Sequence, residues 1–217
     1  MSAVILEKEK YRDSNRESHQ EDEKKLLEFQ RHDGPLSILG FWLFLATDLI
    51  LFACLFATYL VLRTHTDGGP TGQELFGIRG FTIETVLLLT SSFTGSLAVF
   101  AMRNRNKTRL IGWLIVTVLL GLGFIGFEVR EFLEYVSEGA TMQRSAFLSA
   151  FFTLVGTHGC HVTFGIFWMI SVIIQLARYG IDAMNARKVF IVGLYWHFLD
   201  IIWVFIFTVV YMTEVAS

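Results

Sequence analysis

Charged residues, prolines and cysteines are all scarce in this sequence of 217 residues. Only 18% of the chain is charged while 53% is hydrophobic, which is more apolar surface than a soluble domain of this size buries. The formal net charge of −2 gives no basic surface for nucleic acid, so no nucleic-acid partner is expected. Cys54 and Cys160 both lie in apolar stretches, where a thiol packs as a small hydrophobic group. The composition therefore predicts a membrane protein without a structural disulfide.

The few charges are concentrated at the N-terminus. Residues 1–33 hold 16 of the 38 charged side chains (18 Lys and Arg, 20 Asp and Glu), and they mix both signs. The segment itself contains no run of seven or more apolar residues behind a basic start, so it is not expected to be a cleaved signal peptide. We expect residues 1–33 to form a charged, partly disordered cytoplasmic tail, and residues 34–217 to form the transmembrane domain.

Five apolar stretches are long enough to cross a bilayer, since about 20 residues at ~1.5 Å each span a ~30 Å hydrocarbon layer. They run from about Leu36 to Leu62, Phe81 to Met102, Leu110 to Phe127 with an extension to about residue 136, Ala146 to Ala177, and Val189 to Met212. Period-2 alternation is absent, and an open sheet leaves its edge unsatisfied in lipid. The expected fold is all-α, a polytopic bundle of five transmembrane helices.

Basic residues are distributed unevenly around these spans. The tail and the loops after the second and fourth spans hold more Lys and Arg than the loops after the first and third spans. Because cytoplasmic loops are enriched in basic residues, the N-terminus is expected in the cytoplasm and the C-terminus in the periplasm. No long segment after the tail is left for a separate catalytic domain, so any chemistry is expected within the membrane.

Ionisable residues within the spans need a partner or a role, because a charge at the bilayer centre costs roughly 2.5 to 3.5 kcal/mol. Five of them are expected at about the same depth, near the middle of the first, fourth and fifth spans: Asp48, His158, His161, His197 and Asp200. The two histidines of the fourth span are three residues apart, as are the histidine and aspartate of the fifth, so each pair projects from one helix face.

Three interpretations of these five residues are open. The first is that Asp48 or Asp200 accepts hydrogen bonds from the histidines and from Trp196 and Trp203, which would join the first, fourth and fifth spans at a gain of only about 0.6 to 2 kcal/mol per contact. The second is a proton relay. A metal site is the third, and it is disfavoured because Cys160 projects from a different face than the two flanking imidazoles.

Three carboxylates lie nearer the outer side of the membrane. Glu84 is just inside the outer end of the second span, where it could reach water, pair with another group or face a lipid-filled gap. Glu128 and Glu131 lie three residues apart in the outer part of the third span, either as a solvated helix end or as buried groups. In the fourth span, Gly156 and Gly159 are expected to admit a closely packed neighbouring helix.

Five segments carry a resemblance to a known family. They are "FWLFLATDLILFACLFATY", "IETVLLLTSS", "GFIGFEVREF", "FLSAFFTLVGTHGCHVTFG" and "YWHFLDIIWVFIFTVVY". In this order they resemble the helices of subunit III of the haem-copper respiratory oxidases, over about residues 36–212. The likeness is greater to the bo-type ubiquinol oxidases, whose subunit III has five spans.

The resemblance implies an accessory subunit of a complex in the bacterial inner membrane that oxidises ubiquinol, reduces dioxygen to water and moves protons across the membrane. It implies that this subunit is not itself catalytic and holds no cofactor, since haem and copper belong to subunit I. The implied partners are subunit I directly, subunits II and IV in the same complex, and bound phospholipid. The alternatives are subunit III of a cytochrome c oxidase and a proton-conducting membrane protein that acts alone.

The same resemblance implies roles for individual residues. Glu84 corresponds to a carboxyl that reacts with carbodiimides near a lipid cleft. The remaining polar residues correspond to other buried polar positions of the family: Asp48, Glu128, Glu131, His158, His161, His197 and Asp200. Only three histidines lie within the spans, and two haems and a copper need about six, so the sequence also predicts that this chain holds no redox metal.

Overall fold

The computed structural model describes residues 34–66 and 78–212, so the expectations for the N-terminal tail lie outside the described residues. The described part consists of helices α2 (Gly34–Leu62), α4 (Ile78–Arg103), α5 (Lys107–Ser137), α6 (Ala146–Tyr179) and α7 (Ala183–Ile206), followed by the π-helical segment η2 (Phe207–Met212). Five helices are long and apolar enough to cross a membrane, with α7 and η2 forming one of them. The predicted all-α fold with five spans is confirmed.

Helices α5 and α7 begin before the predicted apolar stretches, and polar residues cap the starts of α5, α6 and α7. Asn106 caps α5, Ser145 caps α6 and Asp182 caps α7, and each side chain accepts a hydrogen bond from the backbone N–H three residues later. Helix α6 ends at Tyr179 and is capped by Gly180, whose φ of +78° is a value that glycine adopts without strain. Hydropathy predicts the apolar centre of each span, whereas capping determines where the helix begins and ends.

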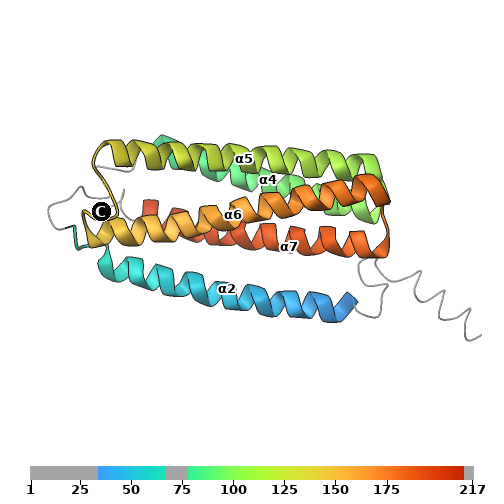
Figure 1. Cartoon of the computed structure of the whole chain (residues 1–217), viewed down its shortest axis with the longest axis horizontal. Helices are drawn as coiled ribbons and strands as arrows, with labels where there is room; N and C mark the ends of the chain where they lie inside the picture. The colour runs from blue at the N-terminus through green and yellow to red at the C-terminus, as the bar shows by residue number, and fades with distance from the viewer. Residues whose placement is uncertain (1–33, 67–77, 213–217) are drawn as a thin grey trace, which may run out of the picture.

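The helices lie side by side along the long axis of the molecule, with α2 at the edge beside α6 and α7 (Figure 1). Helix α4 packs against α5 and α7, and α6 packs against α5, α7 and α2. Helix α7 is the most enclosed span and α2 the least. The outward face of α2 carries large apolar side chains such as Trp42, Leu43 and Ile50, which suit contact with lipid.

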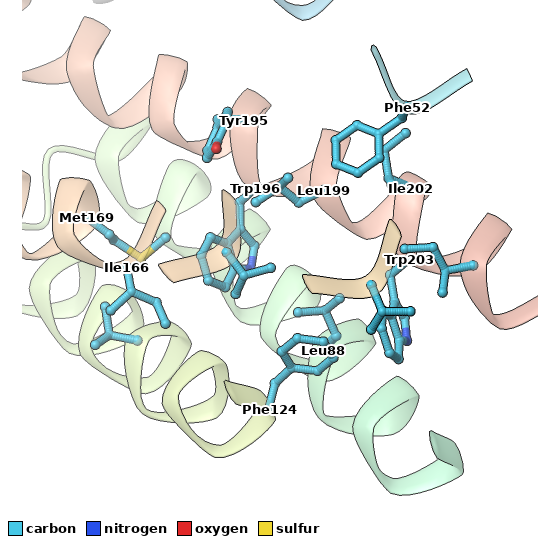
Figure 2. Close-up of a cluster of buried hydrophobic side chains, with 14 of the residues drawn as sticks. Phe52, Leu88, Phe124, Ile166, Met169, Tyr195, Trp196, Leu199, Ile202 and Trp203 are labelled. Atoms are coloured by element: carbon cyan, nitrogen blue, oxygen red, sulfur yellow. The ribbon is translucent and has the colours of Figure 1, made fainter. Parts of the chain in front are cut away.

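The core is formed by aromatic and aliphatic side chains from all five helices (Figure 2). Helix α7 contributes Tyr195, Trp196 and Trp203, all at most 2% exposed. The ring of Trp203 makes an edge contact with Phe124 on α5 at a centroid distance of 4.7 Å. Because lipid is as apolar as these side chains, close van der Waals packing and hydrogen bonds hold the helices together.

Candidate functional site

The contact between Asp48 and His161 joins α2 to α6 near mid-span. Asp48 Oδ2 lies 3.5 Å from His161 Nε2, and Asp48 is only 8% exposed. The other ring nitrogen, Nδ1, donates to the carbonyl oxygen of Thr157 at 2.7 Å, which fixes the orientation of the imidazole. The Phe52 ring packs against His161 with a centroid distance of 5.2 Å. The first and fourth spans are therefore joined by the aspartate and histidine that the sequence placed at equal depth.

His158 is fully buried and uses a backbone partner on α7. Its Nε2 donates to the carbonyl oxygen of Leu199 at 3.2 Å. The imidazole packs between the rings of Phe124 and Trp203, at centroid distances of 5.8 Å and 5.2 Å. Within the bundle, His158 is thus a connection between α6 and α7 and makes no contact with a carboxylate among the described residues.

The tryptophans of α7 donate to hydroxyl groups on α4. Trp196 Nε1 donates to Ser91 Oγ at 3.0 Å, and Trp203 Nε1 donates to Thr85 Oγ1 at 3.1 Å. The expectation that these indoles donate to Asp48 or Asp200 is wrong. Helix α4 packs directly on this face of α7, and a hydroxyl satisfies an indole N–H without placing another charge in the membrane.

His197 and Asp200 also face α4. The Oγ of Ser92 lies 2.6 Å from His197 Nδ1, and that of Ser96 lies 3.2 Å from Nε2. Asp200 is half-buried and interacts with Ser92 through a side-chain hydrogen bond. The predicted shared face of His197 and Asp200 is present, but it is directed to the second span. The five mid-depth residues therefore form separate contacts and not one cluster.

Glu84, Glu128 and Glu131 come together between α4 and α5. Glu84 is 1% exposed and Glu128 is 4% exposed, and the three carboxyls are close enough to interact electrostatically. Tyr135 donates its hydroxyl hydrogen to Glu131 Oε2 at 3.4 Å. Both oxygens of Glu84 and Oε1 of Glu128 have no hydrogen-bond partner among the described residues. The interpretation of Glu128 as a solvated helix end is wrong, because α5 continues to Ser137 and α6 covers this face.

The burial of Glu128 could be predicted from the spacing of the apolar residues of α5. It lies four residues after Phe124 and seven before Tyr135, both of which are buried, so all three share one face of α5. Similarly, Glu84 lies between Phe81 and Leu88 on the buried face of α4. Glu84 is therefore directed into the bundle, while its reactivity with a carbodiimide stays a prediction.

Gly159 provides the space that the Glu128 carboxyl occupies. A Cβ atom at residue 159 would lie 2.5 to 2.8 Å from the three carboxyl atoms of Glu128. At Gly156 the nearest atom to such a Cβ is a ring carbon of Phe132 at 3.7 Å, which is an ordinary contact. The predicted close approach of another helix at these two glycines is present, with α5 as the neighbour.

Substituting alanine for Gly159 is expected to displace the Glu128 carboxyl and to destabilise the bundle by about 1 kcal/mol, since the flexible end of the glutamate can move partly aside. The midpoint of thermal unfolding of the purified chain or complex measures the effect. Gly156→Ala is the matched control and should have little effect. In a Glu128→Ala background the cost of Gly159→Ala should disappear, and an unchanged cost there would rule out this contact.

Among the residues that the structure describes, grooves open at two places on the side of the bundle. One lies between α5 and α6, where a cavity of about 590 Å³ is lined by Phe132, Cys160 and His161, among other residues. A second cavity of about 390 Å³ shares Phe132 and Cys160 with it and reaches Glu128. The other groove, about 380 Å³, lies between α2 and α7, and its lining is almost entirely apolar: Leu49, Phe52, Ala53, Phe56, Ala57, Leu60, Ile202, Phe205 and Val209.

No group of three or more His, Cys, Asp or Glu side chains with the geometry of a metal site occurs in residues 34–66 and 78–212. The histidines of the spans instead contact hydroxyl, carbonyl and carboxylate oxygens, which belong to neighbouring helices except for the Thr157 carbonyl on α6 itself. The arrangement can therefore hold the helices together.

Comparison with known proteins identifies the family. Residues 8–215 match the family described as cytochrome c oxidase subunit III. Quinol oxidase subunit 3 of Bacillus spizizenii is 51% identical over 186 residues, which are 86% of this chain and 91% of that protein. The protein of the same name from Bacillus subtilis strain 168 is 50% identical over the same shares. Cytochrome c oxidase subunit 3 of Bacillus sp. strain PS3 is 51% identical over 83% of this chain and 87% of its own length.

The match covers every helix of the bundle and all of the polar residues described above. An identity of about 50% over at least 180 aligned residues is too high to arise by chance. This multi-pass membrane chain belongs to the cytochrome c oxidase subunit III family, the accessory third subunits of the haem-copper oxidases.

Proposed function

We propose that this chain serves a terminal quinol oxidase, a complex of the bacterial inner membrane that oxidises ubiquinol, reduces dioxygen to water and translocates protons. The observation that carries the proposal is the identity of about half of the aligned residues with two proteins named quinol oxidase subunit 3. Since a protein named cytochrome c oxidase subunit 3 is equally similar, the electron donor is the part of this proposal that an assay has to decide.

The role of the chain within that complex is to pack against subunit I, with subunits II and IV in the same assembly, and to support proton uptake without binding haem or copper itself. Its internal contacts support this role. His158 donates to the carbonyl oxygen of Leu199 on α7. His161 contacts Asp48 on α2 and the Thr157 carbonyl of its own helix. His197 contacts the serines of α4. Such engaged imidazoles suit a scaffold better than a redox centre.

The proposed orientation places the N-terminus and the tail of residues 1–33 in the cytoplasm and the C-terminus in the periplasm. The contacts at one end of the bundle support it. Arg187 at the start of α7 donates to Ser37 at the start of α2, and Lys107 at the start of α5 donates to the carbonyl oxygen of Ala177 near the end of α6. Basic residues are thus gathered at the end where the chain enters α2, as cytoplasmic ends are.

Oxygen consumption by the intact complex tests the electron donor. Turnover with a ubiquinol analogue and none with reduced cytochrome c would support the proposal, and the reverse result would make the complex a cytochrome c oxidase. Purification from native membranes tests the accessory role. Isolation together with a haem-bearing, multi-span partner supports it, whereas proton flux through the chain alone in vesicles would support a stand-alone proton conductor.

The α2–α7 groove is the proposed phospholipid site, because its lining is apolar and it opens along the first span. Ala57→Trp should fill the groove and reduce the phospholipid that copurifies with the complex by about one molecule per chain. Lipid extraction with mass spectrometry measures this ratio. Ile50→Trp is the control, since Ile50 is 65% exposed outside the groove. Equal lipid content in both variants and in the unmodified complex would place the lipid elsewhere.

A further inference from the structure

The contact between Asp48 and His161 is made by two side chains that can each gain or lose a proton. His161 Nδ1 lies 2.7 Å from the carbonyl oxygen of Thr157. A carbonyl oxygen only accepts hydrogen bonds, so Nδ1 carries a hydrogen. This contact determines the tautomer of the ring, because a neutral His161 then has its lone pair on Nε2.

Nε2 is the atom that faces Asp48, with Oδ2 at 3.5 Å. Oδ2 is buried and has no hydrogen-bond partner among the described residues. If His161 were neutral and Asp48 ionised, two acceptors would face each other in apolar surroundings, which is unfavourable. If both groups were protonated, the pair would carry an unbalanced positive charge at membrane depth, which is costly.

We propose that Asp48 and His161 bind a single proton between them, so that the pair is neutral as a whole and forms a proton-dependent link between α2 and α6. The proton resides either on the carboxyl, which then donates to Nε2, or on the imidazole, which then donates to Oδ2. Both arrangements give one hydrogen bond and no net charge. The proposal does not depend on which electron donor the oxidase uses.

The polar side chains of Tyr195 and His158, which lie near this carboxyl, donate to other acceptors. Helix α7 presents Tyr195, whose hydroxyl donates to the carbonyl oxygen of His161 at 3.1 Å and so is not directed to Asp48. Helix α6 presents His158, whose Nε2 donates to a backbone carbonyl of α7. Helix α2 contributes the apolar ring of Phe52. Apart from His161, no basic side chain within residues 34–66 and 78–212 forms an ion pair with Asp48.

The imidazole of His161 is partly exposed in the α5–α6 groove. The His161 side chain is 22% exposed and lines the α5–α6 groove, which also reaches Thr141 and Met142 in the connection between these helices. On the α5 side the groove is lined by Phe132, Leu133 and Val136, and the titratable group that α5 presents near this depth is Glu128, which the adjoining cavity reaches. When the pH rises enough to remove the proton, two acceptors are left facing each other, and the attachment of α2 to α6 weakens.

Infrared and nuclear magnetic resonance spectra of the intact oxidase show whether Asp48 and His161 each carry a proton. The infrared difference between the unmodified complex and Asp48→Asn shows whether the carbonyl stretch of a protonated carboxyl is present. The nitrogen spectrum of labelled histidine, compared with that of His161→Phe, shows whether the ring is imidazolium. A protonated carboxyl with a neutral ring, or an ionised carboxyl with an imidazolium, supports the proposal. Protons on both groups or on neither would overturn it.

Asp48→Asn and Asp48→Leu separate a proton-dependent link from a purely structural one. The amide of asparagine donates an N–H to Nε2 at any pH, whereas leucine donates nothing. Retention of this subunit by the oxidase after mild heating, measured at a series of pH values, is the readout. The Asp48→Asn profile reports the pH dependence of the rest of the complex, so the difference between it and the unmodified profile belongs to the pair.

We expect retention of the unmodified subunit to fall with rising pH relative to Asp48→Asn, because loss of the one proton shifts the unfolding equilibrium of the subunit by up to about tenfold for each unit of pH. Asp48→Leu should be retained poorly at every pH. Identical profiles for the unmodified complex and Asp48→Asn would overturn the proposal. Retention of Asp48→Asn as poor as that of Asp48→Leu would also overturn it, since the amide would then fail to replace the shared proton.

Discussion

Trp203→Ala is expected to destabilise the bundle by about 3 kcal/mol, the low end of the cost of removing a buried tryptophan. Trp203 is 0% exposed, contacts the rings of Phe124, His158 and Tyr211, and donates its indole hydrogen to Thr85. The lower figure applies because a tryptophan released from this bundle enters lipid and not water, so that lost packing and the cavity account for most of the cost.

The thermal midpoint of the complex, followed by loss of this subunit, measures the effect of Trp203→Ala. Trp42→Ala is the matched control, because Trp42 is 54% exposed on the lipid face of α2 and its removal should change little. Trp203→Phe should cost only about 1 kcal/mol, since the ring contacts are largely kept and the hydrogen bond to Thr85 is lost. Equal effects of alanine at both positions would contradict the role assigned to Trp203.

The number of helices and the apolar centre of each could be predicted from the sequence because the bilayer sets the length of an apolar span. The predicted range from Leu36 to Leu62 agrees with α2 to within two residues. The predicted third span began at Leu110, whereas α5 begins at Lys107, where Asn106 caps the helix. Hydropathy detects lipid-embedded residues, and it is insensitive to polar residues that continue a helix beyond the hydrocarbon.

The contact between Asp48 and His161 was accessible to sequence reasoning because depth in the membrane limits which polar groups can meet. The partners of Trp196 and Trp203 were not accessible in the same way. Depth does not say which helices are neighbours or how each is rotated, and both indoles face α4. Serine and threonine are common in membrane helices, so no single hydroxyl stands out in a sequence as the acceptor.

The sequence also contains part of the information that places the Glu84 carboxyl beside those of Glu128 and Glu131. The buried side of each helix can be read from the period of its apolar residues, and Glu84 and Glu128 both lie on such a side. Their meeting requires that α4 and α5 be adjacent, which the short connection between Arg103 and Lys107 favours. The interpretation of Glu128 as part of a solvated helix end gave more weight to the charged residues around it than to the spacing of the apolar residues of α5.

Gly121→Leu is expected to have an effect as large as that of Trp203→Ala, because α5 crosses the core at this glycine. A Cβ atom at residue 121 would lie 2.8 Å from the ring of Trp196 and 3.4 Å from Ile166. Trp196 is held in place by its hydrogen bond to Ser91 and by Gly165 on its other side, so it cannot move aside easily. We expect a cost of about 3 kcal/mol, the upper end of the usual range for overpacking.

Gly126→Leu on the same helix provides the control for Gly121→Leu. No atom lies within 4 Å of a Cβ at residue 126, so leucine there extends into lipid and improves the helix propensity of α5 by up to about 1 kcal/mol. The two variants have the same composition and differ only in the face of α5 that they change. A loss of thermal stability in Gly121→Leu alone would show that Trp196 packs against α5 as described, whereas equal behaviour of the two variants would contradict this packing.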